Sequence, residues 1–165
     1  MRNLVLILIL ILAQVLICNH IMLFGVAMPI IFIYGIFRLP ISLNPKTVLT
    51  IAFVSGFLID ILSDTPGLNS LAATVVAALR RPIYGAYTGG DDSLQHLTPS
   101  ISTLPPAIYI KYLITLTLIY CTLVFFIEYF SFTAVGAIIV KIIASTLLSS
   151  VVMLGIDGLM RASRS

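Results

Sequence analysis

Charged side chains are scarce in this sequence, and their scarcity excludes most water-soluble proteins. Only 9% of the 165 residues are charged, 60% are hydrophobic, and the mean hydropathy is +1.17. A soluble domain is nearer to half apolar and about a quarter charged. Tryptophan is absent, whereas Leu, Ile and Val occur in long blocks. The composition therefore predicts an all-α integral membrane protein, with residues 1–165 forming a single polytopic domain.

The residues that build catalytic and metal sites are few and scattered. Cys18 and Cys121 both lie inside apolar runs, so no disulfide framework is indicated. His20 and His96 fall in different expected loops on opposite sides of the membrane, and no cysteine accompanies either, so we expect no metal site. The Gly-Gly-Asp-Asp stretch at 89–92 indicates a flexible acidic loop and not a phosphate-binding loop. We therefore expect neither an enzyme nor a cofactor, since even an enzyme acting on lipid-linked substrates would lack a catalytic set.

Apolar runs divide the chain into about six expected transmembrane helices. One helix over residues 4–37 would be about 50 Å long, beyond the ~30 Å of a hydrocarbon core, so the chain must turn between Asn19 and Pro29. The second and fourth runs are short for a span, and we expect the second to lean on other helices. The six runs are Leu4–Cys18, Met28–Leu39, Thr47–Ser63, Leu68–Leu79, Pro106–Phe130 and Phe132–Met160.

The basic residues predict the orientation of these spans. Arg2 before the first run also fits a cleavable signal peptide, but no small-x-small cleavage site follows, so we interpret that run as a retained span. With both termini in the cytoplasm, the cytoplasmic side receives eight of the nine basic residues and the outer turns receive none, as the positive-inside rule requires. A five-span arrangement would place Arg2 opposite the other basic clusters. The eight residues are Arg2, Arg38, Lys46, Arg80, Arg81, Lys111, Arg161 and Arg164, and a partly ordered cytoplasmic loop is expected at about 80–105.

Four charged residues fall inside the expected spans, where an unpaired charge is costly. Asp157 precedes Arg161 by one helical turn near the cytoplasmic end, which indicates an interfacial pair. Glu128 lies at the outer end of the fifth run and is expected to reach headgroups or water. Asp60 and Lys141 lie at similar depths, which permits a direct or water-bridged pair. The alternatives are that Lys141 extends to the outer headgroups and that Asp60 is hydrated through the turn beside it.

Small residues surround Asp60 in a pattern that favours close helix packing. Ala52, Gly56, Asp60 and Ser63 share one helical face, and a second face of small residues follows in the fourth run. Between the two faces, Asp64, Thr65, Pro66 and Gly67 form a tight polar turn, in which Asp64 and Thr65 are suited to cap the next helix. The stretch therefore predicts a helical hairpin with a polar elbow, which packing alone would also explain.

This hairpin carries a resemblance to a known family. The stretch GFLIDILSDTPGLNSLAATVVAALRRP resembles the signature of the rod shape-determining protein MreD family. The matching positions are Gly56, Asp60, Ser63, Thr65, Pro66, Gly67, Leu68, Asn69 and the pair Arg80-Arg81. The remainder of the chain resembles that family only in length, number of spans and basic cytoplasmic ends, and its loop at 80–105 is longer.

The resemblance implies a non-enzymatic scaffold of the bacterial cell-elongation machinery, located in the inner membrane. Its implied partners are an MreC-like bitopic protein, the actin-like MreB filament, and the polymerase and transpeptidase of sidewall peptidoglycan synthesis; nucleic acid is not expected. The family also resembles in fold the substrate-binding subunits of energy-coupling-factor vitamin transporters. Those subunits commonly carry an alanine at every fourth position of the first helix, where this chain has Ala13 alone. A transporter subunit is therefore the alternative.

Overall fold

The structure is a computed structural model that describes residues 2–16, 28–65, 67–90, 98–128 and 135–162. The described residues contain helices and no strand. Three of the helices are long and apolar enough to cross a membrane, namely 45–63, 106–128 and 136–160, and residues 5–16 form a shorter apolar helix. The prediction of an all-α fold is confirmed for the described residues, and the three long apolar helices support a membrane protein. The elements are α1 (Arg2–Leu16), α2 (Ile33–Phe37), α3 (Pro45–Ser63), α4 (Leu68–Thr88), α6 (Pro106–Glu128) and α7 (Val135–Ala162).

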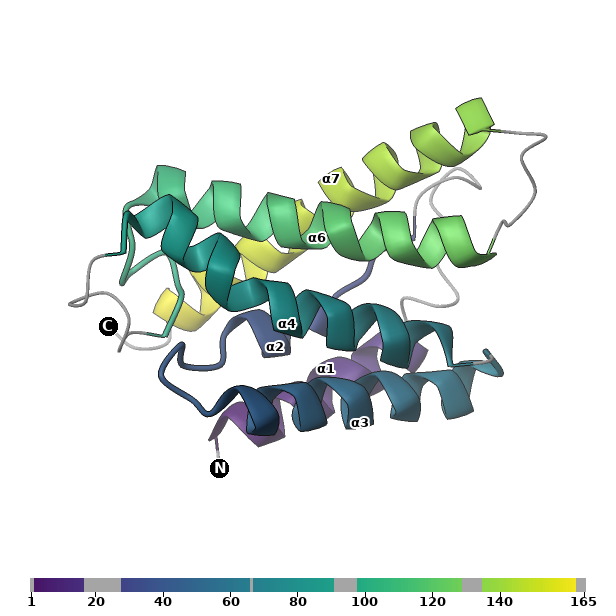
Figure 1. Cartoon of the computed structure of the whole chain (residues 1–165), viewed down its shortest axis with the longest axis horizontal. Helices are drawn as coiled ribbons and strands as arrows, with labels where there is room; N and C mark the ends of the chain where they lie inside the picture. The colour runs from purple at the N-terminus through teal and green to yellow at the C-terminus, as the bar shows by residue number, and fades with distance from the viewer. Residues whose placement is uncertain (1, 17–27, 66, 91–97, 129–134, 163–165) are drawn as a thin grey trace.

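Helices α3 and α4 form an antiparallel hairpin to which the other helices are added (Figure 1). α1 packs on α3, α6 packs on α4, and α7 packs on α6. The short helix α2 contacts α1, α3 and α4, and all five of its residues are buried. The α3–α4 turn, the end of α1, the end of α6 and the beginning of α7 lie at one end of the bundle, which we call the hairpin end (Figure 1). The beginning of α1 and the end of α7 lie at the opposite end.

Two of the expected spans differ from the structure in length. The second run contains only the five-residue helix α2, because Pro29 and Pro40 confine it on both sides and its neighbours bury it completely. The fourth run continues as helix past Arg80 and through Pro82, and ends at Gly89, whose φ of 65° is left-handed. The expected loop at 80–105 is therefore helical over its first nine residues.

Helix α3 begins with residues that are typical of a helix N-terminus. Asn44 is the N-cap, its Oδ1 accepts a hydrogen bond of 3.1 Å from the backbone N–H of Lys46, and Pro45 occupies the first helical position. The expected turns at 19–29 and around Ser131 fall largely on residues 17–27 and 129–134, outside the described residues.

Candidate functional site

Gly56 is the point of closest approach between α3 and α4. A Cβ atom built on Gly56 would lie 2.5 Å from the Cα of Ser70 and 2.7 Å from the backbone oxygen of Asn69. These are backbone atoms at the beginning of α4, so they cannot move aside as a flexible side chain would. The small-residue contact predicted for this face is present, and Gly56 permits it.

Asp60 is held by the first turn of α4. Its Oδ1 accepts hydrogen bonds from the backbone N–H of Asn69 (2.9 Å), from Asn69 Nδ2 (3.0 Å) and from the hydroxyl of Thr65 (2.6 Å), while its Oδ2 accepts one from the backbone N–H of Ser70 (2.8 Å). The side chain is only 3% exposed. Helix N-termini have free N–H groups and a partial positive charge, so a carboxylate there is doubly favoured. Asp60 is therefore a cap for α4 supplied by the preceding helix.

The elbow between the helices has a different role from the predicted one. Asp64 is the C-cap of α3 in a left-handed conformation (φ 53°), and its backbone N–H donates to the carbonyl of Asp60. Gly67 is also left-handed (φ 76°) and is the N-cap of α4, which has no local side-chain cap. The prediction that Asp64 caps α4 is thus wrong, whereas the hydroxyl of Thr65 donates to Asp60 and accepts from Asn69 Nδ2 at 3.3 Å. Pro66 lies outside the described residues, and Ser63 is half-buried at the elbow.

Tyr120 joins this hairpin to α6. Its hydroxyl donates to Oδ1 of Asn69 at 2.6 Å, and its ring packs edge-on against Phe32 at a centroid distance of 5.7 Å. The ring is completely buried. Sequence reasoning did not select Tyr120; its one signal is a hydroxyl inside an apolar run, which needs a partner when buried.

The structure accounts for Asp60 without Lys141. The four hydrogen bonds to its carboxylate all come from Thr65, Asn69 and Ser70. A direct or water-bridged pair between Asp60 and Lys141 stays a prediction.

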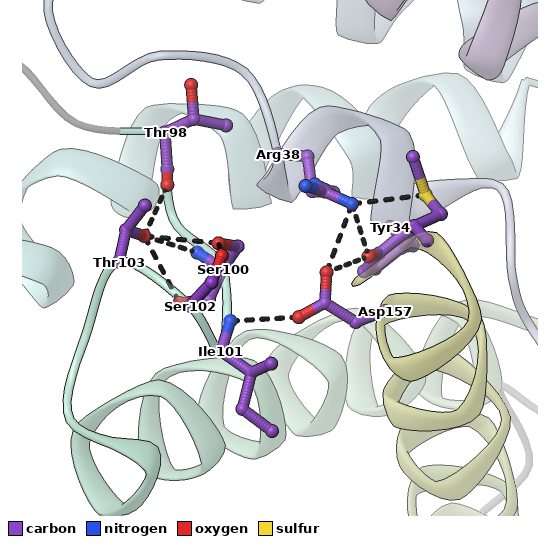
Figure 2. A network of polar contacts seen from close by, with 9 residues as sticks. Tyr34, Arg38, Thr98, Ser100, Ile101, Ser102, Thr103 and Asp157 are labelled. Atoms are coloured by element: carbon purple, nitrogen blue, oxygen red, sulfur yellow. Dashed lines mark hydrogen bonds and ion pairs between the residues drawn. The ribbon is translucent and has the colours of Figure 1, made fainter. Parts of the chain in front are cut away.

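A second polar cluster lies at the opposite end of the bundle (Figure 2). Asp157 Oδ1 pairs with Nη1 of Arg38 at 3.0 Å and accepts the Tyr34 hydroxyl at 2.7 Å, and its Oδ2 accepts the backbone N–H of Ile101 at 2.8 Å. Asp157 is 3% exposed and is therefore buried inside the bundle. The acid predicted to pair with Arg161 pairs with Arg38, because α2 lies beside the end of α7. The side chain of Arg161 is outside the described part of the structure.

Arg80 is also buried, at 1% exposure. Its guanidinium donates to the carbonyls of Ile36 (2.7 Å), Leu39 (2.7 Å) and Pro40 (2.8 Å), which follow or end α2. The carbonyls of Ile36 and Pro40 also accept backbone N–H groups, and the guanidinium adds a charged donor at a helix end, where carbonyls carry a partial negative charge. Arg80, counted in the sequence as a cytoplasmic charge, thus fixes the chain after α2.

A cavity of about 560 Å³ lies beside the elbow at the hairpin end. Thr65 and Asn69 of the hairpin line it, together with residues of α1, α6 and the segment before α2. Among the residues that the structure describes, no three His, Cys, Asp or Glu side chains come together as a metal site would require.

The chain was compared with known proteins of three kinds. No family of proteins, no curated protein and no solved structure matches it.

Proposed function

We propose that this protein is a non-enzymatic membrane scaffold of the bacterial cell-elongation machinery, similar in role to MreD. In this proposal it binds an MreC-like bitopic partner in the inner membrane and supports sidewall peptidoglycan synthesis. The proposal rests on the structure of the α3–α4 hairpin. Gly56, Asp60, Thr65, Gly67 and Asn69, on which the resemblance rests, all take part in one hydrogen-bonded and closely packed unit.

The chemistry of this unit supports a positioning role. Both oxygens of Asp60 accept hydrogen bonds, and the amide of Asn69 donates to Asp60 and Thr65 and accepts from Tyr120. A carboxylate engaged in this way fixes the geometry of two helices, which is useful for presenting a surface to a partner.

The proposed topology has six membrane segments and both termini in the cytoplasm. It is supported by the beginning of α1 and the end of α7, which lie together opposite the hairpin (Figure 1). To test it, single cysteines replace the exposed residues Asp64 and Gly90 in a protein whose native cysteines have been removed. An impermeant maleimide applied to intact cells should label position 64 and not position 90, and the reverse pattern would overturn the orientation.

The partner is tested by affinity purification from the native bacterium in a mild detergent. The expected result is co-purification of a single-span protein with a coiled-coil periplasmic region, together with rounded cells when the chain is depleted. The variant Asp60→Asn should reduce the recovered partner, whereas Asp64→Asn, an exposed position on the same elbow, should not. Recovery of no such protein, with normal rods after depletion, would refute the scaffold.

The alternative is the substrate-binding subunit of a vitamin or other micronutrient transporter, and the cavity favours it. Its volume of about 560 Å³ falls within the range of small-molecule sites. In the same purification this function would give an ATPase module and a tightly bound water-soluble ligand.

A further inference from the structure

The cavity at the hairpin end has walls that suit hydrocarbon. It is lined by apolar side chains from three parts of the chain: Phe32 before α2, Ile59 of α3, and Val124 and Phe125 of α6. All four are buried, with exposures between 1% and 8%. Such side chains offer dispersion contacts to a hydrocarbon ligand.

The deeply placed polar groups of the lining already have partners inside the protein. Gln14 is 5% exposed; its Nε2 donates to the carbonyl of Pro29 (3.1 Å) and its Oε1 accepts from the N–H of Ile31 (2.8 Å). Asn69 is likewise bonded through both atoms of its amide, to Asp60 and Tyr120. A water-soluble ligand needs donors and acceptors to replace those of water, and these groups would have to break existing bonds to supply them.

The cavity opens toward the apolar outside of the bundle. Two of its lining residues, Leu71 of α4 and Ile127 of α6, are 51% and 40% exposed. Leu71 is near the beginning of α4 and Ile127 near the end of α6, and these two helices pack together, so exposed lining residues of the cavity belong to these two helix ends. Glu128, also exposed, lines the cavity next to Ile127 and provides a charged group at its rim.

We propose that this cavity binds one hydrocarbon chain of a lipid, which enters between the ends of α4 and α6 and keeps its polar head outside the apolar walls, at the rim of the cavity. The buried apolar walls receive the chain, and the internally bonded amides of Gln14 and Asn69 close the site without exposing free polar groups. The proposal does not depend on the scaffold function. It conflicts with the transporter alternative, in which the same space would hold a water-soluble compound.

Photocrosslinking of the wild-type protein tests this directly. The protein is reconstituted in vesicles containing phosphatidylethanolamine with a diazirine on one acyl chain, or in plain vesicles with a diazirine fatty acid. After irradiation, labelled residues are mapped by mass spectrometry. Labelling of the buried residues Ile59 or Val124 by either probe supports the proposal, and the probe that labels them identifies the source of the chain. Labelling confined to exposed residues such as Leu118 and Val151 would overturn it.

A cavity-filling variant gives a second test. Val124→Trp places a large ring in the space, whereas Val151→Trp places the same ring on α7 at a residue that is 67% exposed. Labelling of Ile59 should fall about tenfold in Val124→Trp, the effect of losing roughly two buried methylene groups, and stay unchanged in Val151→Trp. Equal labelling in both variants, or displacement of the probe by a water-soluble extract but not by fatty acid, would overturn the proposal. Melting temperatures show whether each variant is folded, and the wild-type labelling map decides the question if Val124→Trp is not.

Discussion

At the hairpin end a buried carboxylate is held by residues close in the sequence, whereas at the opposite end one is held by residues far along the chain. The partners of Asp60 lie five to ten positions away, on the elbow and the first turn of α4. The partners of Asp157 lie 56 to 123 positions away, on the segment after α4 and around α2. The hydrogen bonds of Asp60 therefore need only the α3–α4 hairpin. Those of Asp157 form only when α2, α7 and the 98–105 segment have assembled, so they depend on the whole fold.

The comparison also concerns the kind of partner. The described partners of Asp60 are all dipoles, namely backbone N–H groups, a hydroxyl and an amide. The partners of Asp157 include a full positive charge, the guanidinium of Arg38. Removing one member of a buried ion pair leaves the other charge unpaired, which costs more than losing one dipolar contact. The largest effects of mutation are therefore expected at the end opposite the hairpin.

The largest expected effect is that of Arg38→Met. It leaves Asp157 buried beside Tyr34 without its cation, which should destabilise the protein by about 3–5 kcal/mol. Thermal unfolding in detergent measures the change. The matched variant Arg161→Met, which removes the partner predicted from sequence, should shift the melting temperature little. A larger effect of Arg161→Met than of Arg38→Met would indicate that Asp157 pairs with Arg161 on its own helix. It would contradict the conclusion that residues far along the chain hold Asp157.

Gly56→Leu should follow, with a loss of about 3 kcal/mol, the upper end for overpacking, because the new side chain meets the backbone of Ser70. Gly155→Leu is the control, since a Cβ atom there meets nothing within 4 Å. The readouts are abundance in membranes and the melting temperature. Equal behaviour of the two variants would mean that α3 and α4 do not approach each other at Gly56.

Asp60→Asn should cost about 2 kcal/mol, as expected when a charged cap is replaced by a neutral side chain. Asp64→Asn should be nearly silent, because the Asp64 side chain is exposed and asparagine tolerates the left-handed conformation. The melting temperatures of the two variants are compared under identical conditions. A stronger effect at Asp64 would indicate that Asp64, and not Asp60, caps α4.

The smallest expected effect is the coupling between Asp60 and Lys141. Because the hydrogen bonds to Asp60 come from its own hairpin, Asp60→Asn and Lys141→Met should be additive within about 0.5 kcal/mol in a double-mutant cycle. A coupling well above that value would show that the two charges interact inside the helix bundle.

Sequence reasoning was most informative where the partners are local. The small-residue face at Gly56, the tight elbow and the importance of Asp60 all follow from patterns within about fifteen residues. The exact donors to Asp60 did not follow, because a cap is normally sought beside its helix and not on the preceding one. The ion pair between Asp157 and Arg38 was missed because the sequence shows a basic residue, Arg161, one helical turn from Asp157, whereas Arg38 reaches Asp157 only in the folded protein. Tyr120 and the buried role of Arg80 were missed for the same reason, since their partners are reached only after the fold places α2 against α4, and α6 against the hairpin.

The cap on α4 has a consequence for how the protein is made. Helix α3 emerges from the ribosome before α4 and carries a carboxylate whose donors have not yet been synthesised. In hydrocarbon that charge is costly, and the cost is removed when the first turn of α4 arrives. In the proposed topology, this cost would couple the insertion of the two helices, and we expect them to enter the bilayer as a pair.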